Sequence, residues 1–151
     1  MTTQNEVTDF ESLIERDGVF AQLTKGISMM PLIRQNRDTI IVKKIENAPK
    51  ENDVLLYKKN SGKYVLHRVI KVLENGYVIR GDNNFFNEYD IKDEDIIGIL
   101  EGFYRDNKYI DCNKNKLYKL YIQLNRRTYY LRKCYSKFRS LLSKIKHAII
   151  K

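Results

Sequence analysis

Residues 26–31 read GISMMP, and the expected fold is built outward from this stretch. Gly26 permits a backbone turn that other residues resist. Pro31 fixes its own φ and stops a helix from continuing. The run VFAQL at residues 19–23 precedes the stretch and predicts a strand. Ser28 would thus stand just beyond a strand, an arrangement that by itself is more typical of an ordinary turn than of a catalytic site.

Two further stretches place a histidine and a carboxylate after this serine. Residues 64–70 (YVLHRVI) predict a strand with His67 near its middle, and residues 77–80 (YVIR) predict another strand that ends shortly before Asp82. A serine hydroxyl is a poor nucleophile at neutral pH, so it needs a neighbouring base, and that base gains from a third group that orients it. The order Ser28, His67, Asp82 is therefore compatible with nucleophilic catalysis.

The combined motifs resemble the signal peptidase I superfamily of serine peptidases, which also includes the self-cleaving LexA-like repressors. The resemblance runs from about residue 19 to residue 102 and rests on four motifs: SMMP at 28–31, NDVLLY at 52–57, HRV at 67–69 and RGDNN at 80–84. Bacterial signal peptidases carry lysine before Arg-Val. This chain has His67 there, as the endoplasmic-reticulum, archaeal and sporulating-bacterial types do.

The resemblance implies roles for individual residues. Ser28 would be the nucleophile and His67 the general base, and Asp82 matches an acidic position of the Gly-Asp-Asn box. A downstream aspartate of the family falls on Glu88, which is a departure from the pattern. It stays open at this point whether Asp82, Glu88 or Asp90 orients the histidine.

The implied mechanism begins when neutral His67 takes the proton of Ser28 as the hydroxyl attacks a peptide carbonyl. The Ser28 amide is one candidate donor to the oxyanion, and Gly26 lies where the family places a second donor. Gly26 and Met29 are the candidate oxyanion and substrate-binding residues. The resemblance also implies that the substrate lies extended beside the strand before Ser28 and beside one from residues 53–67, with small side chains near the cut.

The first three quarters of the chain are expected to be mainly β, in agreement with the fold that the resemblance implies. Typical hairpin turns lie at 60–62 (NSG), 75–76 (NG) and 106–107 (DN). Between the turns, β-rich runs predict antiparallel strands at residues 19–23, 39–43, 53–58, 64–73, 77–80, 96–103 and 109–110.

Two segments are expected outside these strands. Residues 8–16 predict a short helix, because Phe10 and Ile14 share one face and Thr8 stands at capping-box spacing before Glu11. The acidic residues of the segment 90–95 predict a solvated loop.

Charge is divided unevenly along the 151-residue chain, whose formal net charge is +9. All 19 acidic residues lie at or before Asp111, and 12 of the 28 basic residues follow it. Residues 1–111 therefore carry 16 basic and 19 acidic groups, a net of −3, whereas residues 112–151 carry +12. This asymmetry predicts a near-neutral peptidase-like β domain over 1–111 and a basic tail over 112–151.

Residues 112–151 predict one long amphipathic helix. Apolar and aromatic residues recur there at alternating steps of four and three, and only Thr128 in the series is polar. The series is Leu117, Tyr121, Leu124, Thr128, Leu131, Tyr135, Phe138, Leu142, Ile145 and Ile149. Since no acidic residue follows Asp111, such helices would repel one another in a coiled coil. Basic flanks around an apolar stripe favour an anionic membrane surface as the partner of residues 114–151. Docking onto the body or a partner protein is the alternative, and nucleic acid is least favoured because no base-reading motif is visible.

Cysteine and histidine usage excludes some classes of protein. Cys112 and Cys134 do not make a disulfide framework, and a reduced compartment is expected. With two histidines and no Cys-x-x-Cys motif, we expect no metal and no cofactor. The polar N-terminus lacks the apolar run of a signal peptide, and no window approaches the roughly 18 apolar residues of a membrane-spanning helix. We therefore expect a cytoplasmic protein, with peripheral membrane attachment as an open alternative.

Two classes of function follow from these patterns. The favoured one is a serine endopeptidase that cleaves a peptide or protein precursor with Ser28 and His67. The alternative is a non-catalytic peptide- or membrane-binding module on the same fold, which Glu88 and the missing transmembrane anchor of signal peptidases keep open. A LexA-like repressor is disfavoured, because the part before residue 19 is too short for a helix-turn-helix domain.

Overall fold

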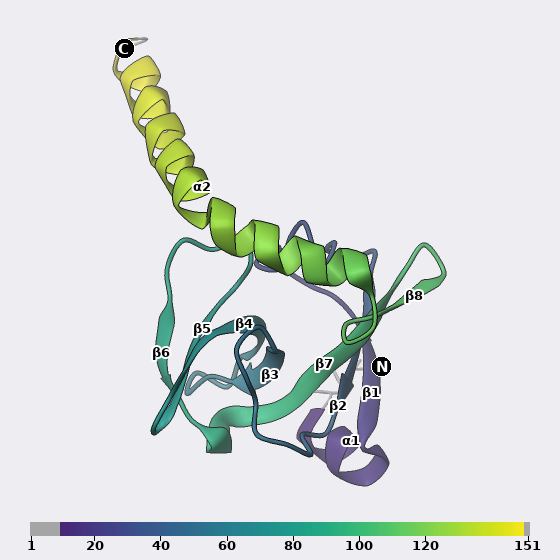
Figure 1. Ribbon diagram of the computed structural model, residues 1–151. Helices are drawn as coiled ribbons and strands as arrows, with labels where there is room; N and C mark the ends of the chain where they lie inside the picture. Colours follow the sequence, from purple (N-terminus) through teal and green to yellow (C-terminus); the bar gives the residue numbers. More distant parts are fainter. Residues whose placement is uncertain (1–9, 150–151) are drawn as a thin grey trace, which may run out of the picture. The chain divides into compact units, whose positions relative to one another are not determined.

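Antiparallel strands build one sheet, in the order β1-β2-β7-β3-β4-β5-β6 with β8 paired to β7. The structure is a computed structural model that describes residues 10–149, apart from the side chains of 144 and 146–149. Its strands are β1 (Val19–Leu23), β2 (Thr39–Lys43), β3 (Val54–Lys58), β4 (Tyr64–Leu73), β5 (Gly76–Arg80), β6 (Glu88–Ile91), β7 (Ile96–Arg105) and β8 (Lys108–Asp111) (Figure 1). The predicted mainly antiparallel β fold is confirmed.

The chain divides into two units, Met1–Asn115 and Lys116–Lys151. The first unit, called the body below, holds the sheet, helix α1 (Phe10–Asp17) and the short 3-10 helix η1 (Asp93–Asp95). The second is helix α2 (Lys116–Ile149). The predicted short N-terminal helix and long C-terminal helix are thus confirmed, while Thr8, the predicted cap, lies outside the described residues.

Strand β7 joins the two parts of the sheet. Its beginning pairs with β3, and its later part pairs with β2 and β8; Figure 1 shows it crossing the body as one long curved strand. Gly98 of this strand leaves room for α1, because a Cβ there would lie 2.6 Å from Ile14 Cδ1. Ile14 is buried as the helical pattern predicts.

Strand β3 lies inside the sheet and is buried on both faces from Val54 to Tyr57. Leu55 and Tyr57 of β3 belong to one apolar cluster with Val69, Tyr77 and Ile79 of the two strands that follow. The Tyr57 hydroxyl is therefore carried into the interior, where a polar group requires a partner.

The segment after β5 differs from the sequence prediction. Residues 90–95 are predicted as an acidic loop. In the structure, Asp90 belongs to strand β6 and residues 93–95 form the 3-10 helix η1. The strand is only four residues long, and Asp90 has a positive φ of 60°, so no regular alternation is visible in the sequence. The consequence is that Glu88 lies on a strand, opposite Ile79 of β5.

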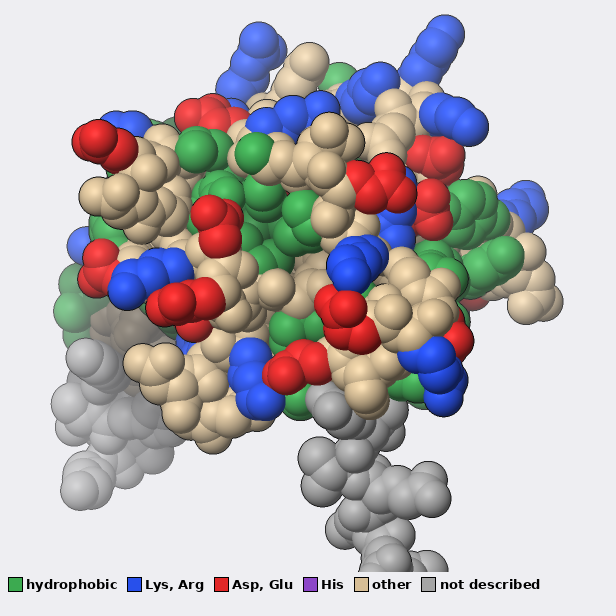
Figure 2. Space-filling view, turned by 90° about the horizontal axis from the view of Figure 1, so that it is seen from below, with side chains coloured by type: hydrophobic (Ala, Val, Ile, Leu, Met, Phe, Trp, Pro, Cys, Tyr) green, Lys and Arg blue, Asp and Glu red, His purple; other side chains and the backbone are tan. Residues whose placement is uncertain are grey.

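Charges of both signs are interspersed on the body. Figure 2 shows the face seen from below Figure 1, where acidic and basic side chains surround exposed hydrophobic ones. Lysine–carboxylate pairs are common on this unit, for example Lys44 with Glu15 at 2.9 Å and Lys58 with Glu11 at 2.7 Å.

Candidate active site

Hydrogen bonds join the two ends of the loop that carries Ser28. The amide and hydroxyl of Thr24 both donate to the Asp38 carbonyl, at 3.1 and 3.0 Å. The Asp38 carboxylate is fully buried and accepts hydrogen bonds from Arg34 at 2.9 Å and from Arg105 of β7 at 2.7 Å. These contacts hold residues 24–38 as one closed loop at the end of β1.

A second turn packs against Ser28. The Asn83 amide donates to the Ser28 carbonyl at 2.8 Å, and the Asn83 side chain donates to the Ile27 carbonyl at 3.1 Å. Gly81 fits between this loop and the histidine: a Cβ there would lie 2.7 Å from the Ser28 carbonyl oxygen and 2.9 Å from His67 Nε2. Glycine at this position therefore lets the serine loop and His67 Nε2 come together.

One cavity of about 590 Å³ is lined by most of the predicted site residues, namely Gly26, Ser28, Met29, His67 and Glu88. Gly26 has a φ of +87°, which favours glycine, and the position that a Cβ would occupy there is open. Met29 is buried in the cavity wall. Within the described part of the chain, the Ser28 hydroxyl makes no hydrogen bond, so it can rotate without losing a partner.

Glu88 is the carboxylate that contacts His67. Its Oε1 lies 2.9 Å from His67 Nδ1, although no hydrogen bond of good geometry forms to this oxygen. The Tyr57 hydroxyl donates to Glu88 Oε2 at 2.8 Å, and the Lys59 ammonium pairs with the same oxygen. Tyr57 also lies 3.3 Å from His67 Nδ1. This arrangement places the Nδ1 edge of the ring against Glu88 and leaves Nε2 beside Gly81.

Burial sets the protonation of this pair. It lowers the pKa of His67 below its ordinary value, and the charge of Glu88 offsets only part of the effect. Burial by itself would raise the pKa of Glu88, but hydrogen bonds from Lys59 and Tyr57 outweigh it and lower the pKa below its ordinary value. At neutral pH the site thus holds a neutral imidazole beside an ionised carboxylate, the state that a general base needs.

Asp82 is bound by another partner. Arg68 donates to both of its carboxylate oxygens, at 2.8 and 2.7 Å, and both side chains are buried. Arg68 also donates to the Asn52 carbonyl at 2.8 Å. Because His67 and Arg68 are neighbours on β4, their side chains point to opposite faces of the strand. Of the three acids left open by the sequence, Glu88 contacts His67, Asp82 pairs with Arg68, and Asp90 is exposed.

Two strand edges border the cavity. β1 is an end strand of the sheet and contributes Gln22 and Leu23 to the lining. On the other side, residues 65–67 of β4 pair with β3, but pairing with β5 begins only at Arg68. Among the described strands, none pairs with the outer edge of β1 or with the edge of residues 65–67 that faces away from β3. An extended peptide could therefore add as a strand there, with main-chain hydrogen bonds on both sides.

Sequence reasoning missed Tyr57 and Lys59 as site residues. A usable signal was the predicted β3–β4 hairpin, whose register places Leu55 opposite His67 and Tyr57 opposite Val65. Tyr57 is then a diagonal neighbour of His67 on the same face, within reach of a long side chain. Lys59 carried no comparable signal, because its contact depends on the path of residues 81–88.

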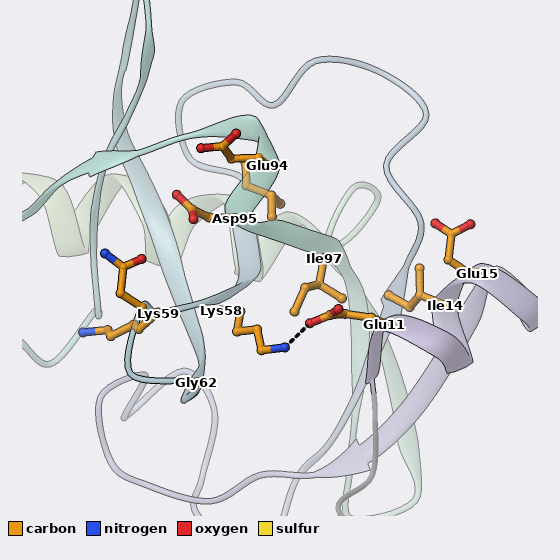
Figure 3. Close-up of a pocket in the computed structure, with 11 residues that line it drawn as sticks. Glu11, Ile14, Glu15, Lys58, Lys59, Gly62, Glu94, Asp95 and Ile97 are labelled. Atoms are coloured by element: carbon orange, nitrogen blue, oxygen red, sulfur yellow. Dashed lines mark hydrogen bonds and ion pairs between the residues drawn. The ribbon is translucent and has the colours of Figure 1, made fainter.

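A second cavity of about 590 Å³ lies between α1 and the β3–β4 turn (Figure 3). Figure 3 shows the Lys58–Glu11 ion pair reaching across it, with Glu94 and Asp95 on another side. Its lining includes neither Ser28 nor His67. Among the described residues, no group of three or more histidine, cysteine or acidic side chains could hold a metal ion.

Comparisons with protein-family models, curated proteins and solved structures gave no match to this chain. No helix in the described range 10–149 is long and apolar enough to cross a membrane.

Proposed function

We propose that the protein is a serine endopeptidase of the signal-peptidase-like type, which cleaves a peptide or protein precursor. One observation carries the proposal: His67 has Glu88 at Nδ1 and turns Nε2 toward Gly81, against which the Ser28 loop packs, and all three side chains line one cavity. A serine near a histidine whose other ring nitrogen contacts a carboxylate is the arrangement of nucleophile, base and orienting acid used in serine hydrolysis.

The proposed reaction has two halves. His67 Nε2 takes the proton of Ser28 Oγ while Oγ forms a bond to the peptide carbonyl carbon, and the amides of Ser28 and Gly26 are the candidate donors to the oxyanion. The imidazolium then gives its proton to the leaving amine as the peptide bond breaks. Water then attacks the acyl carbon while His67 takes its proton, and His67 passes that proton to Ser28 Oγ as the ester bond breaks, which releases the acid product and restores the free serine.

The edges of β1 and of residues 65–67, which no other described strand covers, support an extended substrate that binds as an added strand. By resemblance to the family, small side chains would be preferred near the cut. The same edges would also serve a module that binds peptides without cutting them, and this is the second candidate function. For either activity, we propose that the protein is cytoplasmic and is attached peripherally to a membrane through its basic helix α2.

The decisive experiment incubates the purified chain with a diverse peptide library, with and without anionic vesicles, and identifies cuts by mass spectrometry. Ser28→Ala and His67→Ala are expected to abolish cutting, whereas Ser61→Ala, which changes an exposed serine of the β3–β4 turn, is expected to keep it. If the wild type binds peptides but does not cut them, the peptidase proposal is wrong and the binding module takes its place.

A further inference from the structure

Helix α2 carries charge of one sign only. Its 34 residues include ten basic side chains and no acidic one. The body mixes both signs of charge and forms ion pairs within the unit, among them Lys44 with Glu15 and Lys58 with Glu11. A helix of this length with ten basic residues and no acidic one attracts an anionic partner.

The same helix exposes an apolar stripe that is interrupted at Thr128. Large apolar side chains, each at least 46% exposed, follow one another at helical spacing: Leu117, Leu120, Leu124, Leu131, Tyr135, Phe138, Leu142 and Ile145. Single exposed apolar residues are normal, but a stripe of this extent marks an interaction surface. The sequence predicts most of this stripe; Tyr121 and Thr128, which also belong to the predicted pattern, are partly buried.

Basic side chains stand on both sides of the stripe. With 3.6 residues per turn, Arg127 borders one side of it and Arg139 the other. Arg132 is held within the helix by the Asn125 side chain at 3.0 Å. Arg127 and Arg139 are exposed, and the long stems of such residues reach along an apolar surface while their charges stay in water.

We infer that α2 is an interfacial helix whose ligand is an anionic lipid bilayer. The stripe would enter the boundary between headgroups and acyl chains, and the bordering arginines would lie at the level of the lipid phosphates. This deepens the location given under the proposed function, but it does not require peptidase activity. A second copy of the helix is the poorer occupant, because two such helices bring only like charges together. Nucleic acid would use the charge but leave the apolar stripe exposed to water.

The charge arm of the test measures binding of the full chain, as Ser28→Ala, to vesicles by co-sedimentation. Vesicles with phosphatidylglycerol are expected to bind the protein, more weakly as salt is raised, and vesicles of phosphatidylcholine alone are expected to bind it far less. Arg127→Gln with Arg139→Gln should weaken binding about 25-fold, at about fivefold for each charge near the surface. Lys71→Gln with Lys108→Gln removes the same charge from exposed positions of the body and should leave binding nearly unchanged.

The stripe arm compares two adjacent residues of equal exposure, Leu131 at 73% and Tyr130 at 74%. Leu131 lies on the stripe and Tyr130 lies off it, so Leu131→Asn should weaken vesicle binding about tenfold or more, while Tyr130→Asn should not. Circular dichroism of each variant checks that the helix persists. Equal losses in the two variants, no binding to anionic vesicles, a dimer held through Leu131, or a preference for a DNA duplex over the vesicles would each overturn the inference. Because the protein used is Ser28→Ala, a failed peptidase proposal cannot produce any of these results.

Discussion

Two carboxylates, the buried Asp82 and the partly buried Glu88, stand next to consecutive residues of β4, and they have different partners. Asp82 lies on the face of Arg68, where a permanently charged guanidinium holds both of its oxygens. Glu88 lies on the face of His67, where it contacts a ring that can gain and lose a proton. The difference teaches that the partner, more than the acid itself, sets what each carboxylate can do: Asp82 is held in a fixed ion pair, whereas Glu88 faces a side chain that can titrate.

The Glu88 side of this comparison gives the largest expected effect. Glu88→Gln keeps the size of the side chain but removes the charge that orients and stabilises the protonated ring. If the protein is a peptidase, kcat should fall about 10³- to 10⁴-fold, with little change in thermal unfolding. Single-turnover cleavage of a peptide from the library measures it. A variant that loses folding instead of activity would place Glu88 in the same class as Asp82.

Substitution of Asp82 should lower the stability of the fold. Asp82→Asn leaves the Arg68 charge buried without its counter-ion, which costs about 3–5 kcal/mol of the free energy of unfolding. Urea denaturation followed by circular dichroism gives this quantity. Asp90→Asn, at an exposed position, is the matched control and should change stability by less than about 0.5 kcal/mol. Full stability of Asp82→Asn with lost activity would reverse the assignment.

Tyr57 offers a finer test of how Glu88 is held. Tyr57→Phe removes one hydrogen bond to a charged group, which is worth about 1.5–3 kcal/mol. Activity should fall about tenfold, and the pKa of Glu88 should rise because one of the interactions that lower it is gone. An NMR titration of the Glu88 carboxyl in Ser28→Ala, with and without Tyr57→Phe, separates this effect from unfolding. An unchanged or lower pKa would contradict it.

The smallest expected change concerns pH dependence. Burial lowers the pKa of His67, so kcat/KM should fall in acid along a limb whose midpoint lies below about 6.5. The Lys59 charge contributes to that lowering, and Lys59→Met should therefore move the limb to higher pH. Lys71→Met, far along β4 and exposed, should leave the profile in place. A limb that moves to lower pH would show that Lys59 acts through another group.

The fold followed closely from local sequence, because hairpin turns carry their own chemistry. Gly62 and Asn107 adopt the positive φ values that their turns require, and strands on either side begin near the predicted residues. The strand that bears Glu88 escaped prediction, since its regularity comes from pairing with β5 and not from a pattern of its own.

Which acid contacts His67 could be read only from the three-dimensional structure. Asp82 and Glu88 are separated by a turn whose path decides which side chain meets which face of β4, and periodicity says nothing about that path. Motif order predicts Ser28 and His67 as a pair, but it does not reveal Gly81, where a Cβ would meet both the Ser28 carbonyl oxygen and His67 Nε2.

The two strand edges that border the cavity carry a consequence for what can be cut. A segment that enters between β1 and residues 65–67 must offer both sides of its own backbone, so it has to give up any helix or sheet to which it belongs. Under the proposed activity, folded proteins in the same compartment are protected by the free energy of local unfolding. The choice of substrate would then depend first on how readily a segment unfolds locally, and only afterwards on the side chains of that segment.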